Sequence, residues 1–152
     1  MERIASFQVD HNKLEPGLYL SRRDGEATTL DLRFKKPNTG DLLSNAEMHS
    51  VEHVIATLLR SGRAKDAIIY FGPMGCQTGF YLLFDSRQLT DGQAVELVKE
   101  TFAAGAAFDG PMPGKSAAEC GNYINLDIEL AKAQCGFYSE LIRDWSEAKL
   151  AY

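Results

Sequence analysis

The spacing of hydrophobic and polar residues predicts four strands in this chain. GLYLSRRDGEATTLDLRF places two β-prone runs on either side of Asp24-Gly25, a pair that supplies the positive φ of a tight turn, and it predicts a hairpin. AIIYFG and GFYLLFD are short, continuous apolar runs that predict two buried strands, joined by GPMGCQTG. ASFQVD alternates only weakly and predicts an N-terminal strand or an extended arm.

Three further segments have the apolar spacing of helices. The first runs from about Ala46 to Leu59 and ends near Gly62. The second lies in LTDGQAVELVKETFAAGAAF, with Thr90 or Asp91 as its N-cap, and the third in INLDIELAKAQCGFYSELIRDW. Between these two, the Gly- and Pro-rich DGPMPGKSAAECGN predicts a loop.

The order of these segments predicts the fold class. The chain contains no internal repeat or linker, so we expect residues 1–152 to form a single domain. Hairpins instead of strict strand-helix alternation predict an α+β fold, in which a mainly antiparallel sheet packs with about three helices.

Composition and charge narrow the class of partner. With 45% hydrophobic and 24% charged residues, the chain resembles an ordinary globular protein. A net charge of −5 argues against nucleic acid as a partner, because phosphate binding usually requires a basic surface. No apolar run approaches the roughly 18 residues of a membrane span, and MERIASFQVD has no secretory apolar run. We therefore expect a cytoplasmic protein with no membrane partner.

Candidate chemistry appears on the first predicted helix, in EMHSVEHVIATLLR. His49 and His53 are four residues apart, so they project from one helix face and can converge on one cation. With Glu52 they form the pattern H-x-x-E-H, the inverted zinc motif, in which the glutamate shuttles protons. The alternative is a solvated polar patch. Two of the three histidines in the chain occupy the motif, in an otherwise apolar helix, and this favours metal binding.

A catalytic metal usually takes three protein ligands, so a third is needed here. His11, the cysteines and the carboxylates are the candidates. Cys120 in AECGNY is favoured because it lies in a loop just before a predicted helix, whose N-terminus would favour a thiolate. A His₂Cys set suits Zn²⁺ or Fe²⁺ and suits Mg²⁺ or Ca²⁺ poorly. Cys76, between glycines, is either a presented thiol or a space filler, and Cys135 is expected in the core.

Five sequence blocks occur together in the order known from one family. SFQVDHNK, LDLRFKKPN, MHSVEHVIATLLR, GPMGCQTGFY and ECGNY cover most of the chain to about Tyr123. The chain resembles the S-ribosylhomocysteine lyases, the LuxS family, whose metal-binding helix reads HTxEH. This resemblance implies an α+β homodimer with active sites at the subunit interface. Each subunit would hold one divalent metal, Fe²⁺ in the native state and Zn²⁺ or Co²⁺ as substitutes.

The resemblance also implies roles for individual residues. Glu52 and Cys76 match the acid/base pair of the family. The implied metal ligands are His49, His53 and Cys120. Ser6, His11 and Arg33 match positions that contact the substrate ribose, with Ser6 and His11 reaching in from the partner subunit. Arg60 matches an arginine near the homocysteine end of the substrate.

The implied reaction cleaves S-ribosylhomocysteine to homocysteine and dihydroxypentanedione, the precursor of a quorum-sensing autoinducer. The carbonyl migrates along the ribose, and β-elimination then breaks the thioether bond. Recycling of homocysteine in the methyl cycle needs the same chemistry. Two departures from the family pattern are Tyr70, where an aspartate is common, and Leu126, near a frequent histidine. They are expected to affect substrate binding more than the chemistry.

Two other functions fit the metal motif. A peptidase-like metallohydrolase would use a carboxylate or another histidine as third ligand and would be a larger chain with a peptide groove. A non-catalytic metal-binding module would close the metal site with a fourth protein ligand, for which Cys76 is the candidate.

Overall fold

The computed structural model describes all 152 residues, and its strands form one antiparallel sheet in the order β1-β2-β4-β3. The first hairpin joins β1 (Gly17–Asp24) to β2 (Ala27–Arg33), and Gly25 in its turn has a φ of +58°. The second joins β3 (Ile68–Pro73) to β4 (Gly79–Asp85), and β4 pairs with β2 at the centre of the sheet. The predicted hairpin is confirmed, and both apolar runs form strands. β4 is buried as predicted, but β3 lies at the edge of the sheet and exposes Ile69 and Tyr70, so the prediction that it is buried is wrong.

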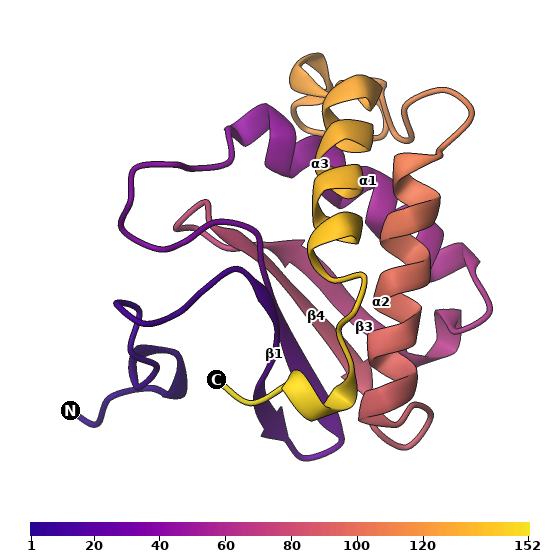
Figure 1. Cartoon of the computed structure of the whole chain (residues 1–152). Helices are drawn as coiled ribbons and strands as arrows, with labels where there is room; N and C mark the ends of the chain where they lie inside the picture. The colour runs from indigo at the N-terminus through magenta and orange to yellow at the C-terminus, as the bar shows by residue number, and fades with distance from the viewer.

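Three helices lie on one face of this sheet, which confirms the α+β class (Figure 1). They are α1 (Asn45–Ser61), α2 (Asp91–Ala106) and α3 (Ile128–Leu141). The Ser44 side chain accepts a hydrogen bond from the backbone at the start of α1. Thr90, one of the two predicted N-caps, does the same for α2. The first predicted helix therefore has nearly the expected bounds.

Alternation along the two central strands separates an apolar face from a polar one. The face toward the helices carries buried side chains of β2 and β4, among them Leu30, Leu32, Phe80, Leu82 and Phe84. Asp31 and Arg33 occupy the intervening positions and point to the opposite face, where both are nonetheless buried. An ion pair thus lies on the sheet face that the helices do not cover.

The third helix begins later than the sequence predicted. Its N-cap is Asp127, whose carboxylate accepts hydrogen bonds from two backbone N–H groups of the first turn. The preceding Tyr123–Asn125 forms a single 3-10 turn. The predicted start of this helix in INLD, close enough to Cys120 to favour a thiolate, is therefore wrong, because Asp127 is the N-cap and the helix begins at Ile128.

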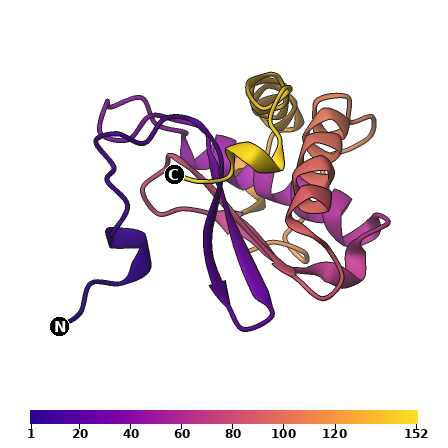
Figure 2. The same ribbon diagram turned by 60° about the horizontal axis from the view of Figure 1, so that its bottom comes forward.

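The N-terminal segment forms an arm that extends away from the helices (Figure 2). Ala5–Phe7 is a short 3-10 turn, so a strand here is wrong and an arm is confirmed. Ile4 and Phe7 expose 55% and 62% of their surface.

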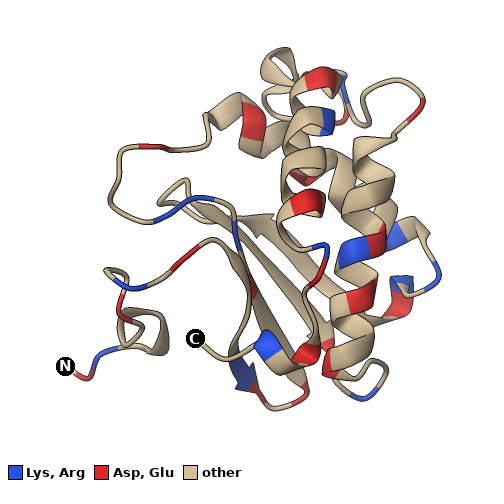
Figure 3. Cartoon of the chain, in the orientation of Figure 1, with Lys and Arg blue, Asp and Glu red and all other residues tan.

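Charged residues of both signs are interspersed along the ribbon (Figure 3). None of the helices combines the length and the apolar character that a membrane crossing needs.

Candidate metal centre and the Cys76 network

The helix α1 and the loop between α2 and α3 bring His49, His53 and Cys120 together. The candidate ligand atoms of these three side chains all lie within 4.8 Å of one another. The two imidazole rings stand at 90°, with centroids 4.7 Å apart, and Nε2 of His49 lies 3.3 Å from Sγ of Cys120. Residues 71 positions apart in the chain therefore form one compact donor cluster, at the place where the sequence predicted a metal site.

An amide outside the cluster fixes the orientation of His49. Nδ1 of His49 donates to Oδ1 of Asn125 over 2.7 Å, and Nδ2 of Asn125 donates to Oδ1 of Asn45 over 2.7 Å. Because Nδ1 carries the proton, Nε2 keeps its lone pair and faces Cys120. Partners of this kind set the tautomer and the ring angle of metal-binding histidines.

His53 is fixed by a backbone carbonyl. Its Nδ1 donates to the carbonyl oxygen of Pro113 over 2.9 Å, which leaves Nε2 free as a ligand. The next residue, Gly114, has a φ of +66°, and a Cβ at this position would lie 2.9 Å from Nδ1 of His53. Glycine thus serves two needs here, the left-handed backbone and the close approach of the loop to the ring.

A small apolar cluster holds the Cys120 loop against α1. Val54, Met112, Leu126 and Ala131 are buried together, and Cys120 packs against them. Leu126 exposes only 1% of its surface. This residue, one of the departures from the family pattern, therefore packs the loop that carries the third candidate ligand.

The donor set suits a borderline divalent metal. Two imidazoles and one thiol form a three-ligand set, and no carboxylate belongs to it. Glu52, half-buried, lines a hollow of about 230 Å³ together with His49, Pro73 and Asn122. A carboxylate is therefore placed beside the cluster, where it can exchange protons with a molecule bound in the hollow.

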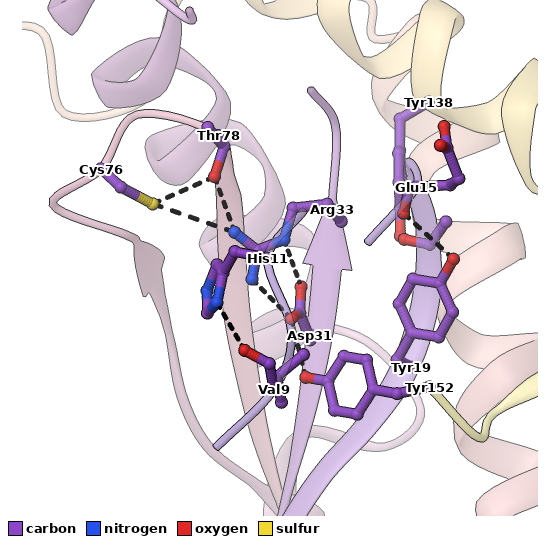
Figure 4. Close-up of polar contacts among 11 residues, drawn as sticks. Val9, His11, Glu15, Tyr19, Asp31, Arg33, Cys76, Thr78, Tyr138 and Tyr152 are labelled. Atoms are coloured by element: carbon purple, nitrogen blue, oxygen red, sulfur yellow. Dashed lines mark hydrogen bonds and ion pairs between the residues drawn. The ribbon is translucent and has the colours of Figure 1, made fainter. Parts of the chain in front are cut away.

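Cys76 lies outside this cluster, in a separate polar network on the β3–β4 loop (Figure 4). Its Sγ is 3.0 Å from Oγ1 of Thr78 and 3.9 Å from Nη1 of Arg33. Nη1 of Arg33 also donates to Oγ1 of Thr78 over 2.7 Å, so the Thr78 hydroxyl proton is free to point at the sulfur. Two donors and one fixed positive charge can stabilise negative charge on the sulfur of Cys76.

Arg33 is held in place by a buried carboxylate. Its Nε and Nη2 donate to the two oxygens of Asp31 over 3.1 Å and 2.6 Å, and the two side chains expose 4% and 1% of their surface. Burial opposes the charge of the guanidinium, but Asp31 outweighs it and raises the pKa of Arg33 above its ordinary value. The guanidinium beside Cys76 is therefore always charged.

His11 lines the same hollow, of about 350 Å³, as Arg33, Cys76 and Thr78. Its Nδ1 lies 2.9 Å from the carbonyl oxygen of Val9, within the N-terminal arm. Three residues predicted to serve catalysis or substrate binding, His11, Arg33 and Cys76, thus surround one hollow.

Other predicted residues are not brought together in one chain. The hollow beside Glu52 and the hollow beside Cys76 share no lining residue. Ser6 is half-buried in the arm and is not among the residues that line either hollow. Arg60, near the end of α1, donates from Nη2 to the carbonyl oxygen of Ile69 over 2.8 Å. Glu52 and Cys76, the predicted acid/base pair, therefore line two different hollows.

Tyr70, the other departure from the family pattern, exposes 50% of its surface on β3. Its ring lies over Gly72, where a Cβ would come within 2.0 Å of the Tyr70 hydroxyl. Any side chain at position 72 would therefore displace the Tyr70 ring.

Sequence reasoning missed Asp31, Thr78 and Asn125. Asp31 and Arg33 are two apart on a predicted strand, a spacing that puts them on one face and could have identified the pair. Thr78 follows Cys76 by two residues in the same loop. Asn125 reaches His49 only through the tertiary fold, so no local signal identifies it.

Comparisons with known proteins agree with this geometry. The chain matches the family described as S-ribosylhomocysteinase (LuxS) over residues 4–149. An S-ribosylhomocysteine lyase of Desulfotalea psychrophila is 46% identical to it, and the match covers 100% of this chain and 99% of that protein. S-ribosylhomocysteine lyases of Borreliella burgdorferi and Clostridium acetobutylicum are each 41% identical to this chain. These two matches also cover 100% of this chain and 99% of the other protein.

Proposed function

This chain belongs to the S-ribosylhomocysteinase (LuxS) family, and we propose that it cleaves S-ribosylhomocysteine to homocysteine and dihydroxypentanedione. One observation carries the proposal. His49, His53 and Cys120 converge within 4.8 Å, with Glu52 beside them, in a chain that is 46% identical to a lyase of this name. Cys76 lies outside the donor cluster and so does not supply the fourth ligand that a closed, non-catalytic metal site would need.

We assign one divalent metal per subunit to His49, His53 and Cys120, with Fe²⁺ as the native ion and Zn²⁺ or Co²⁺ as substitutes. The mixture of imidazole and thiolate donors supports ions of this class over Mg²⁺. When bound, such an ion supplies Lewis-acid chemistry, because it stabilises negative charge on sugar oxygens next to a carbonyl.

The residues of the chain supply the proton transfers. The thioether of the substrate has no carbonyl near it, so the carbonyl must move from the first carbon of the ribose to the second and then to the third. Each move takes a proton from a carbon beside the carbonyl and returns a proton elsewhere. Glu52 and Cys76 carry these protons, and Arg33 with Thr78 holds the sulfur of Cys76. With the carbonyl on the third carbon, loss of the next proton expels homocysteine by β-elimination.

We further propose that the working enzyme is a homodimer whose active sites lie at the subunit interface. In one chain the hollow beside Glu52 and the hollow beside Cys76 share no residue, although the reaction needs both carriers at one substrate. The N-terminal arm, with exposed Ile4 and Phe7, provides apolar surface for a second copy. The metal and Glu52 would then come from one subunit, and Cys76 with His11 from the other.

Mixed dimers test this arrangement. A dimer of His53→Ala and Cys76→Ala subunits contains one site with both changes and one site with neither, if the two groups come from different subunits. Each variant alone is expected to be inactive, and the mixture is expected to recover lyase activity. A mixture that stays as inactive as its parents would contradict the shared site.

The remaining residues are assigned to the substrate. Ser6, His11 and Arg33 would bind the ribose, with Ser6 and His11 reaching in from the subunit that does not hold the metal. Arg33 would come from that same subunit, because it lines one hollow with His11 and Cys76. Arg60 would lie at the homocysteine end. The enzyme would act in the cytoplasm, where it recycles homocysteine and forms the autoinducer precursor.

Solvent deuterium tests the reaction itself. Each transfer through Glu52 or Cys76 exchanges the carried proton with water, so a reaction run in D₂O should place deuterium on the carbon skeleton of dihydroxypentanedione. Homocysteine release without deuterium in the product would contradict stepwise migration of the carbonyl.

A further inference from the structure

The Asp31 carboxylate accepts a hydrogen bond from one other side chain besides that of Arg33. The hydroxyl of Tyr152 donates to Oδ2 of Asp31 over 2.8 Å, and the same oxygen accepts from Nη2 of Arg33 over 2.6 Å (Figure 4). Tyr152 comes from the segment that follows α3, far along the chain from β2. The far end of the chain is thus linked by hydrogen bonds to the residue that contacts Cys76.

The ring of Tyr152 is held by stacking. It packs on Tyr19 of β1, with centroids 5.1 Å apart and an angle of 20° between the planes. The hydroxyl of Tyr19 points elsewhere and donates to the carbonyl oxygen of Glu15 over 3.0 Å. Stacking therefore aims the hydroxyl of Tyr152, and not that of Tyr19, at Asp31.

The Tyr152 hydroxyl acts as a permanent donor. Burial of this group and the neighbouring Asp31 carboxylate raise the pKa of Tyr152 above its ordinary value, so the hydroxyl keeps its proton. It stabilises one oxygen of Asp31 and shares that oxygen with Arg33.

We propose that Tyr152 is a positioning residue for the catalytic thiol, which acts through Asp31 and Arg33 on Cys76. With the hydroxyl present, Asp31 binds Arg33 through both oxygens, and the remaining Nη1 points at Thr78 and Cys76. Without it, Oδ2 of Asp31 loses a donor, and the guanidinium shifts toward that oxygen and away from the sulfur. The inference rests on the proposed role of Cys76 as a proton carrier.

The test measures the rate at which iodoacetamide alkylates Cys76 in the metal-loaded enzyme, with the modified residue identified by mass spectrometry. A thiolate is the reactive form, so the rate reports stabilisation of charge on the sulfur. Tyr152→Phe keeps the stacked ring and removes only the hydroxyl. Tyr19→Phe is the matched control, because it removes the hydroxyl of the other stacked ring, which donates to the carbonyl oxygen of Glu15 and not to Asp31.

We expect Tyr152→Phe to slow alkylation of Cys76 about 3- to 10-fold and Tyr19→Phe to leave it unchanged. This is less than the effect of a hydrogen bond made directly to a charged group, because the hydroxyl acts on the sulfur through Asp31 and Arg33. The value of kcat should fall with the alkylation rate. Equal alkylation of Tyr152→Phe and the parent, or an equal decrease in Tyr19→Phe, would overturn the proposal. Alkylation needs no turnover, so a parent that alkylates as expected but lacks lyase activity would contradict the proposed function instead.

Discussion

The backbone at Gly114 approaches the imidazole of His53 so closely that a Cβ there would lie 2.9 Å from Nδ1. The carbonyl oxygen of the preceding Pro113 accepts the hydrogen bond that fixes this ring. The Pro113–Gly114 loop therefore fixes the position of the His53 ring, and a change in the loop should change the metal affinity.

Gly114→Ala tests this relationship. The new methyl group would push the His53 ring from its position, and we expect metal affinity to fall about 10- to 100-fold, as for other losses of a partner around a metal ligand. Gly25→Ala is the matched control, because Gly25 also has a positive φ, +58°, but has nothing within 4 Å of the added Cβ. Competition with a chromophoric chelator measures the metal affinity of each variant. Equal metal affinity in the two variants would contradict the role of Gly114.

Asn125→Ala removes the acceptor that fixes His49. Without Oδ1 of Asn125, the ring can rotate and either nitrogen can carry the proton, so about a 10-fold or greater loss of metal affinity is expected. The same chelator competition measures it, with Asn12→Ala as control, since Asn12 bonds only to the exposed Asp10. Affinity that stays at the parental value would show that Asn125 does not orient the ligand.

Asp31→Asn tests the buried ion pair. The change leaves the Arg33 guanidinium, 4% exposed, without its counter-charge, and removal of one partner of a buried pair costs about 3–5 kcal/mol. Glu100→Gln is the control, because its partner Arg63 is 60% exposed and such surface pairs contribute about 1 kcal/mol or less. Urea unfolding gives both free energies. A loss for Asp31→Asn no larger than that for Glu100→Gln would refute the expected cost.

The buried thiol of Cys135 should lower the free energy of unfolding at alkaline pH. Burial raises the pKa of its thiol from 9.0 to about 12, and its place in the core is as the sequence predicted. Between pH 9.0, the ordinary pKa of the thiol, and about pH 12, its pKa in the folded protein, the unfolded chain loses this proton and the folded chain keeps it. The free energy of unfolding therefore falls as the pH rises through this range. The slope should approach about 1.4 kcal/mol per pH unit for this group.

Other buried groups, Tyr138 among them, contribute in the same direction. Urea unfolding of the parent and of Cys135→Ala across this pH range therefore isolates the thiol as the difference between two slopes. Parallel slopes would mean that Cys135 does not titrate on unfolding.

Local patterns in the sequence identified most of the fold. Asp-Gly marked the hairpin turn, Thr90 marked the start of α2, and the four-residue spacing of His49 and His53 marked one helix face. The start of α3 was misplaced because Ile124 and Leu126 continue the apolar pattern of the helix, whereas the side chain that starts the helix is Asp127. Local spacing cannot choose between two such starts.

The candidate site was predictable only in part. The candidate metal ligands and the cysteine proposed to be reactive stand in short motifs, but the groups that hold them come from distant segments. Asn125 reaches His49 across 76 residues, and Tyr152 reaches Asp31 across 121. The separation of Cys76 from Glu52 is likewise a property of the tertiary fold, and a second subunit is the proposed means of joining them.

The most direct measurement follows homocysteine release from S-ribosylhomocysteine under anaerobic conditions, with the protein loaded with Fe²⁺ or Co²⁺. We expect release by the parent, none from metal-free protein, and none from Cys76→Ala in its metal-loaded form. Cys135→Ala, a change at a buried thiol of the core, should retain activity. No release from the metal-loaded parent, or undiminished release by Cys76→Ala, would contradict a metal-dependent lyase with Cys76 as proton carrier.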